Sequence, residues 1–190
     1  GAQHGRDNLS SNWSENFNDQ QNAEKPAEIL VQIRSGDDYG WPYCYYDQDL
    51  KSHVLAPEYG GTGRSVTDRC DDADAPLAAF PGHWAPNGLT MYSGQQFPQK
   101  YRNGFFIAFH GSWNRAPLPQ AGYNVVFVPM RDGKAGTYEV FADGFAGTKE
   151  NLPGSAQHRP TGITVAPDGS LYVTDDVGGR IYRIFYRGQQ

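Results

Sequence analysis

Two arginines in this sequence stand where they could bind a negatively charged ligand. Arg6 lies in the polar segment formed by residues 5–8, and Arg159 precedes a proline just before an apolar run. Both are expected at junctions between a strand and a loop. The planar guanidinium group binds carboxylates through two parallel hydrogen bonds, so both residues are candidates for holding an anionic group. The alternative is that each arginine is an ordinary solvated surface residue.

A third candidate is the stretch His-Gly-Ser-Trp-Asn-Arg at residues 110–115, which directly follows the apolar run 105–109. A strand that ends in this way gathers polar and stacking groups at its end. The flat face of Trp113 could stack on a flat ligand. The alternative is a structural tryptophan whose indole N–H binds a neighbouring sheet. His83 and His158 are weaker candidates that stand just before predicted strands and could line the same face.

Short β-prone runs that would position these groups occur twice in the same order. The first set comprises residues 88–92, 105–109, 125–128 and 138–141, and the second comprises residues 162–165, 171–174 and 181–184. Each set opens with a polar residue, a glycine and an apolar residue, and turn residues separate the runs. Four antiparallel strands per repeat are typical of a β-propeller blade. We therefore predict an all-β fold with no helix longer than about three turns.

The number of repeats indicates part of a propeller. A closed ring needs typically ~4–8 blades, and the last repeat here has only three predicted strands. We expect residues 1–190 to form a portion of one propeller domain. A further strand is predicted at residues 28–33, whereas residues 1–28 are predicted to be mostly surface loop and residues 48–80 irregular.

Composition limits the classes of protein to which the chain can belong. Its 190 residues include 16 Lys and Arg against 21 Asp and Glu, a net charge of −5, and 14% are aromatic. So much aromatic material indicates a packed core and argues against disorder. The mild acidity, without a basic run, argues against nucleic acid or an anionic membrane as partner. No apolar stretch reaches the ~18–20 residues of a membrane span.

The two cysteines, Cys44 and Cys70, stand outside any zinc-binding spacing. The polar, glycine-rich segment between them has little apolar content to order it, and a disulfide there would lower the entropy of the unfolded chain. We predict that the two residues are bridged, which would indicate an oxidising compartment. Two unrelated free thiols are the alternative.

Four segments resemble the glucose/sorbosone dehydrogenase family. They are residues 5–8, residues 36–42 (Gly-Asp-Asp-Tyr-Gly-Trp-Pro), residues 106–115 and residues 159–163. The long stretch ending at residue 115 points to the sorbosone-dehydrogenase-like branch. The resemblance covers nearly the whole chain but only the C-terminal part of the family's usual length. It implies a six-bladed propeller, of which this chain is roughly the C-terminal half, with pyrroloquinoline quinone (PQQ) and calcium as cofactors.

The resemblance also implies roles for particular residues. Arg6 would polarise the quinone carbonyl and so act as the catalytic residue, and Arg159 would hold the cofactor or its substrate side. Asp7 stands where the family more often has asparagine, and an acid beside an anionic cofactor needs a cation to compensate it. The implied cofactor-binding residues are therefore Arg6, Asp7, His110, Ser112, Trp113, Arg115 and Arg159.

Calcium prefers oxygen ligands, including backbone carbonyls. The loop that would supply those carbonyls corresponds to residues 22–28, and it departs from the family's Gly-Pro pair. Glu28, Tyr39 and Asp47 match positions that surround the metal loops in relatives. The alternative is a group of ordinary surface carboxylates.

The reaction implied is base-assisted hydride transfer from a sugar to PQQ, followed by reoxidation by an external electron acceptor. The family's catalytic histidine lies N-terminal to the Gly-Arg-Asp/Asn motif, and His4 does not match it. We therefore expect the chain alone to be inactive and to need the N-terminal half or another chain. The alternatives are a propeller remnant that binds carbohydrate or a protein partner, and a structural half-propeller. A periplasmic or secreted location is expected.

Overall fold

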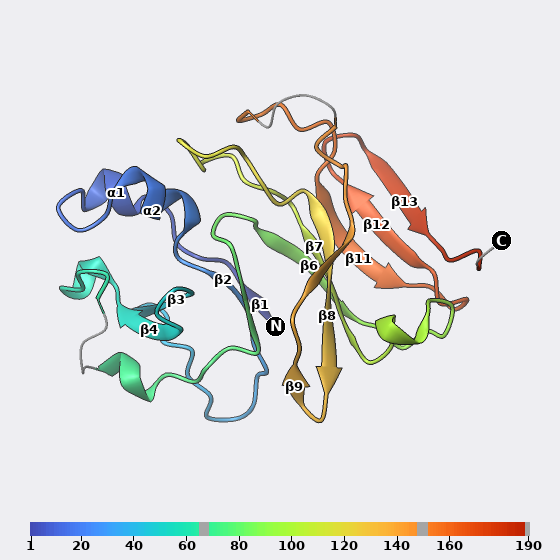
Figure 1. The fold of residues 1–190 in the computed structure, drawn as a ribbon, viewed down its shortest axis with the longest axis horizontal. Helices are drawn as coiled ribbons and strands as arrows, with labels where there is room; N and C mark the ends of the chain where they lie inside the picture. Colours follow the sequence, from blue (N-terminus) through green and yellow to red (C-terminus); the bar gives the residue numbers. More distant parts are fainter. Residues whose placement is uncertain (65–68, 148–151, 189–190) are drawn as a thin grey trace.

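The computed structural model describes residues 1–64, 69–147 and 152–188, which form a row of antiparallel sheets with a smaller N-terminal lobe beside it (Figure 1). Helices are few and short within these residues, as predicted. They are α1 (Leu9–Asn12), α2 (Asp19–Glu24) and the 3-10 turns η1 (Pro57–Tyr59), η2 (Arg69–Asp72) and η3 (Gln99–Tyr101). No helix in the described part of the chain is long and apolar enough to cross a membrane.

Four sheets contain the strands of the described residues. The first sheet has the order β1-β2-β5, the middle sheet β10-β8-β7-β6 with β9 paired to β8, and the last sheet β11-β12-β13, while β3 and β4 form a separate hairpin. The strands are β1 (Ala2–Gln3), β2 (Glu28–Leu30), β3 (Cys44–Asp47), β4 (Ser52–Leu55), β5 (Ala78–Phe80), β6 (Pro86–Met91), β7 (Gly104–Phe109), β8 (Asn124–Arg131), β9 (Lys134–Ala135), β10 (Glu139–Ala142), β11 (Pro160–Val165), β12 (Leu171–Asp175) and β13 (Arg180–Ile184).

The middle and last sheets confirm the repeated unit expected from the sequence. The order β6, β7, β8, β10 is a four-stranded antiparallel meander, and the last sheet has three strands in the described residues. The three sheets lie side by side in Figure 1, as successive blades do. The chain is therefore all-β and forms part of a propeller.

Residues on the middle sheet alternate between two cores. Phe106 of β7 and Val125 and Phe127 of β8 pack towards the last sheet, against Leu171 and neighbouring residues. The intervening residues of the same strands pack towards the first sheet, in a cluster that comprises Leu30, Phe80, Ile107, Phe109, Val126 and Val128. This period of two follows from the strand pleat. Both faces of the middle sheet are buried.

The N-terminal lobe corrects two expectations. Residues 1–28 are not surface loop throughout, since they contain β1, α1 and α2 and bury Leu9 and Phe17 against β3 and β4. The helix α2 begins at a capping box, in which Asn18 accepts from the Gln21 N–H at 2.8 Å and the Gln21 side chain accepts from the Asn18 N–H at 2.9 Å. Residues 48–80 are not wholly irregular either, because they include β4 and β5.

Candidate functional site

A cleft of about 400 Å³ opens where the ends of β1, β2, β6, β7 and β11 converge. This size is within the range of small-molecule sites. Polar residues dominate its lining, which comprises His4, Gly5, Asp7, Glu28, His83, Ala85, Asn87, His110, Gly111, Trp113, Asn114 and Arg159.

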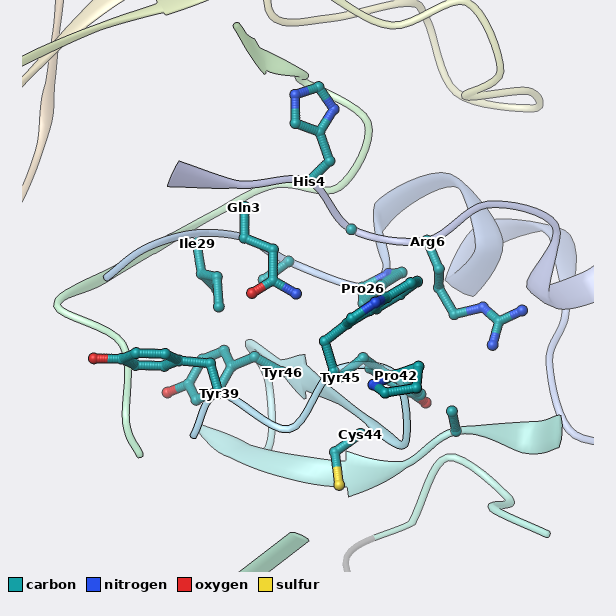
Figure 2. Close-up of a pocket in the computed structure, with 14 residues that line it drawn as sticks. Gln3, His4, Arg6, Pro26, Ile29, Tyr39, Pro42, Cys44, Tyr45 and Tyr46 are labelled. Carbon is teal, nitrogen blue, oxygen red and sulfur yellow. The ribbon is translucent and has the colours of Figure 1, made fainter. Parts of the chain in front are cut away.

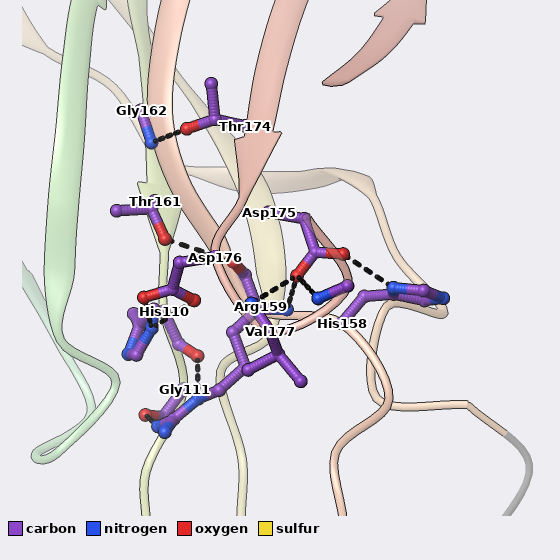
Figure 3. Close-up of polar contacts among 11 residues, drawn as sticks. His110, Gly111, His158, Arg159, Thr161, Gly162, Thr174, Asp175, Asp176 and Val177 are labelled. Carbon is purple, nitrogen blue, oxygen red and sulfur yellow. Dashed lines mark hydrogen bonds and ion pairs between the residues drawn. The ribbon is translucent and has the colours of Figure 1, made fainter. Parts of the chain in front are cut away.

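Arg159 is held rigidly at one wall of the cleft. Its Nε donates to the His110 carbonyl at 3.0 Å, and one terminal nitrogen donates to the Gly111 carbonyl (Figure 3). The Arg159 backbone N–H donates to Asp175 Oδ1 at 2.9 Å, which fixes the start of β11 against the end of β12. The guanidinium group is therefore oriented before any ligand arrives, and its charge is not neutralised by these neutral carbonyls.

Two aspartates at the end of β12 fix this edge of the last sheet, one to the middle sheet and one to the loop before β11. Asp176 approaches His110 Nε2 with both carboxylate oxygens at 3.0 Å, and Asp175 Oδ2 lies 2.6 Å from His158 Nδ1 (Figure 3). Burial alone would raise the pKa of Asp175, but the backbone N–H of Arg159, together with His158, outweighs burial and lowers it. Asp175 therefore stays ionised and ties the loop before β11 to β12.

His83 forms a charged link at the base of the cleft. Its Nδ1 lies 2.9 Å from Asp7 Oδ1, its Nε2 lies 2.6 Å from the Asn22 carbonyl oxygen, and Asn114 donates to the same Asp7 oxygen at 2.7 Å. Both ring nitrogens face acceptors, and this arrangement favours the imidazolium form, in which both nitrogens donate. Burial opposes this charge, but the bonds to Asp7 and Asn22 raise the pKa of His83 overall. The bond to His83 lowers the pKa of Asp7.

Glu28 is a buried carboxylate at the same cleft. It is 2% exposed, and its oxygens accept from the Gly5 N–H at 2.9 Å and the Ala85 N–H at 3.3 Å. Burial raises the pKa of Glu28, and these N–H donors offset only part of that effect. Glu28 thus joins β1, β2 and the loop before β6, with each oxygen accepting one backbone N–H.

The structure brings together five of the predicted site residues and separates five others. Asp7, Glu28, His110, Trp113 and Arg159 line the cleft, and Trp113 is 62% exposed there. This exposure fits a tryptophan that stacks on a ligand better than a tryptophan that is buried for structural reasons. The residues that do not line the cleft are Arg6, Tyr39, Asp47, Ser112 and Arg115.

The guanidinium group of Arg6 points away from the cleft. It pairs with Glu58 and lies 4.7 Å from the centre of the Trp13 ring. Arg6 lines a different, very small cavity of about 20 Å³, and in Figure 2 its side chain and that of His4 point in different directions. In this arrangement Arg6 is not placed to polarise a ligand bound in the cleft.

Ser112 and Arg115 bind other parts of the protein. The Ser112 hydroxyl donates to Gln120 at 2.8 Å and accepts from the Ala121 N–H at 2.9 Å, so it shapes the loop between β7 and β8. Arg115 is buried and its Nε donates to the Pro119 carbonyl at 3.2 Å. Both side chains hold the loop in which Trp113 and Asn114 reach the cleft.

Tyr39 and Asp47 do not join Glu28. Tyr39 donates to the Gln32 carbonyl, and Asp47 is buried with the Lys25 ammonium 2.7 Å away. Among the residues that the structure describes, no group of three or more His, Cys, Asp or Glu is arranged to hold a metal ion. Glu28, Tyr39 and Asp47 therefore do not converge on one point as side-chain ligands of a calcium ion.

Sequence reasoning did not single out Asn87, Asn114 and Asp176. Asn114 lies within the stretch 110–115, and Asn87 opens a β-prone run, so position offered a signal for both. His83 was weighted weakly, although its place before a predicted strand did suggest this face. Asp176 has no local signal, because its partner His110 is 66 residues away.

Known proteins with similar sequences indicate the family to which this chain is related. The family model described as TrAA12-like matches residues 2–187. An uncharacterised protein of Borreliella burgdorferi is 40% identical over 164 residues, which is 85% of this chain and 39% of that protein. A pyrroloquinoline quinone-dependent pyranose dehydrogenase of Coprinopsis cinerea is 29% identical over 76% of this chain and 22% of its own length.

The fold has relatives among solved structures. The calcium structure of the Trichoderma reesei carbohydrate-active enzyme of family AA12 superposes with a TM-score of 0.55 at 21% identity, over 84% of this chain and 42% of that one. The chain thus spans about two fifths or less of the relatives it matches. The family model matches almost the entire length of this chain, and this match shows that the chain belongs to the TrAA12-like family.

Proposed function

We propose that residues 1–190 are part of one propeller domain of a sugar dehydrogenase and that the cleft binds the carboxylates of its PQQ cofactor. The observation that carries the proposal is Arg159, whose guanidinium is fixed by two neutral carbonyls at the wall of the cleft. Support also comes from the pyranose dehydrogenase of C. cinerea, which is named as PQQ-dependent.

The residues of the cleft fit an anionic, flat cofactor. Arg159 supplies a planar cation, Asn87 and Asn114 supply amide donors, and Trp113 offers an exposed face for stacking. His83, as an imidazolium, compensates Asp7. When bound, PQQ would accept the hydride of the sugar; the chain's own residues would orient it and balance its charge.

The side chains of the described residues do not assemble a calcium site. Both oxygens of Glu28 accept backbone N–H groups, and Asp7 shares one oxygen between His83 and Asn114. The three expected metal residues do not converge. We therefore derive no step through a calcium ion.

The proton acceptor for sugar oxidation must be a group with a free lone pair near the hydroxyl proton. His83 is unsuited, because both of its ring nitrogens donate to acceptors. His110 directs its Nε2 to Asp176, so only its other ring nitrogen is left as a possible proton acceptor. His4 also lines the cleft.

Since the chain spans about two fifths of the T. reesei structure, we expect the 190-residue chain alone not to oxidise aldoses. Turnover by the isolated chain would make His110 the first residue to mutate.

The disulfide between Cys44 and Cys70 supports an oxidising location, so we place the protein in the periplasm or outside the cell. The enzyme's substrate would be a sugar, and an external acceptor would reoxidise the cofactor.

Titration of PQQ into the chain tests the proposal, with tryptophan fluorescence as the readout. We expect saturable quenching in the presence and in the absence of calcium, and much weaker quenching by an o-quinone without carboxylates. Equal quenching by both quinones would show that the cleft does not recognise carboxylates. Absence of saturation would contradict the cofactor site itself.

A further inference from the structure

Neighbouring aspartates at the end of β12 hold two histidines by different ring nitrogens (Figure 3). Asp175 Oδ2 lies 2.6 Å from His158 Nδ1, whereas both carboxylate oxygens of Asp176 lie 3.0 Å from His110 Nε2. Of these two histidines, His110 is the one that lines the cleft. Both partners of the Asp176–His110 contact belong to this chain, so the contact does not depend on the parts of the relatives that lie outside the match.

The backbone of His110 is fixed at both of its polar groups. Its N–H donates to the Ala85 carbonyl at 2.8 Å, and its carbonyl accepts from Arg159 Nε at 3.0 Å. Asp176 then sets the remaining rotation of the ring about the side-chain bonds. Because Asp176 does not line the cleft itself, it acts on a bound ligand through His110.

The turn that carries Asp176 is itself held by hydrogen bonds. Asp175 Oδ1 accepts from the N–H groups of Val177 and Gly178, both at 3.1 Å, and so closes the turn around Asp176. The turn requires glycine at position 178, because a Cβ there would lie 2.3 Å from Asp175 Oδ2. The carboxylate of Asp176 is therefore placed before any ligand binds, which lowers the entropy that binding would cost.

The contact with Asp176 determines which nitrogen of His110 can face a ligand. An ionised carboxylate only accepts hydrogen bonds, so Nε2 must carry a proton. In the neutral ring the other nitrogen, Nδ1, is then an acceptor. Within the part of the chain that the structure describes, no group pairs with Nδ1 of His110. Nδ1 is therefore available to a ligand in the cleft.

We propose that Asp176 is a positioning residue, which keeps the ring proton of His110 on Nε2 and leaves Nδ1 to accept a hydrogen bond from the bound ligand. Arg159, at the same wall, can only donate. A donor cation beside an acceptor complements a ligand with an anionic group next to a hydroxyl or N–H group. PQQ meets this description, since its pyrrole N–H stands beside a carboxylate. That the ligand is PQQ rests on the function proposed above, whereas the position of the ring proton does not.

Long-range ¹H–¹⁵N correlation spectra of the histidine rings test the position of the proton without any ligand. At about pH 8.5, above the ordinary pKa of histidine, we expect a protonated Nε2 and an unprotonated Nδ1 in His110, and the reverse in His158. Asp176→Ala should move the two His110 nitrogen resonances towards each other, because the ring then exchanges between tautomers. It should leave His158 unchanged, which also reports that the turn is still folded. Asp132→Ala, at an exposed aspartate in the turn after β8, is the matched control and should change neither histidine.

A His110 proton on Nδ1, or shared between both nitrogens, would overturn the proposal, and so would unchanged His110 resonances in Asp176→Ala. PQQ titration in the same spectra tests the contact with the ligand. The Nδ1 resonance should move upfield as PQQ saturates the chain, because Nδ1 then accepts a hydrogen bond. Saturation without any change at Nδ1 would overturn this contact alone. Failure of PQQ to saturate would contradict the cofactor site and the contact together, while the spectra without ligand would still decide the role of Asp176.

Discussion

The blade sheets and the N-terminal lobe are stabilised in different ways. In the blades, successive residues of strands β7 and β8 point alternately into two buried cores, and each core contains aromatic and aliphatic side chains. In the lobe, a capping box, a disulfide and the pairing of Lys25 with Asp47 at 2.7 Å and Asp49 at 2.9 Å hold shorter elements. The blade sheets are thus specified by packing with the two-residue period of a strand. The N-terminal lobe is specified by individual contacts between distant residues.

The cleft lies where these two regions meet. Asp7 and Glu28 come from the N-terminal lobe and its adjoining sheet, whereas His110 and Arg159 come from the middle and last sheets. His83 connects the two sides through Asp7 and Asn22. A site at such a junction depends on both kinds of stabilisation, and the following changes separate them.

The largest loss of stability is expected from Phe106→Ala in the blade core. Phe106 is fully buried and its ring lies 4.7–5.4 Å from those of Phe141, Phe127 and Tyr92. Truncation removes buried area and leaves a cavity, which should cost about 3–5 kcal/mol. Urea unfolding measures it; a loss below about 1 kcal/mol would show that the aromatic core does not carry the blades.

Removal of the disulfide by Cys44→Ala with Cys70→Ala should cost somewhat less, about 3 kcal/mol from the entropy of the unfolded chain. The effect should be local, because the bridge joins the β3–β4 hairpin to η2. Hydrogen exchange should therefore accelerate at β3 and β4 before it changes at β7 and β8. Simultaneous acceleration in both regions would contradict their separate stabilisation.

The smallest of these effects concerns the Asp7–His83 link, and it depends on pH. The raised pKa of His83 gives stability that is complete below its ordinary value of 6.5 and is lost as pH rises through the folded-state value. The lowered pKa of Asp7 gives stability above its ordinary value of 3.8 that is lost as pH falls through the folded-state value. The link should therefore stabilise most between these two ordinary values.

Asp7→Asn tests this dependence. Because Asp7 is 44% exposed, the loss between these two pH values should be only about 1 kcal/mol. Urea unfolding at pH 5.5 and pH 8.5 should show a smaller pH effect in Asp7→Asn than in the unmodified chain. The control is Asp132→Asn in the turn after β8, which should keep the original pH dependence. An unchanged pH effect in Asp7→Asn would show that Asp7 is not the group that raises the pKa of His83.

The two regions also differ in how far the sequence predicts them. The runs 105–109 and 171–174 became β7 (Gly104–Phe109) and β12 (Leu171–Asp175), because β-prone residues bounded by turn residues are visible in local sequence. The helix α2 was missed, since its Asn18–Gln21 capping box stands in a polar segment without an apolar period. Local pattern could not show its packing role.

Local sequence likewise predicts only part of the cleft. His110, Trp113 and Arg159 were predicted from their places at strand ends, and they line the cleft. Arg6 was expected there too, but its side chain turns to Glu58, which is 52 residues away in the sequence. Only the folded arrangement reveals such a partner.

The central claim is that Arg159 recognises an anionic cofactor at this junction. The most direct measurement is the PQQ affinity of Arg159→Ala beside Arg131→Ala, since Arg131 lies at the end of β8, outside the cleft. Loss of a charge-assisted contact should weaken binding about ten- to a hundredfold in Arg159→Ala and leave Arg131→Ala unchanged. Arg6→Ala decides between the two arginines singled out in the sequence, and we expect its affinity to stay near that of the unmodified chain. Equal effects at all three positions, or a larger effect at Arg6, would contradict the account.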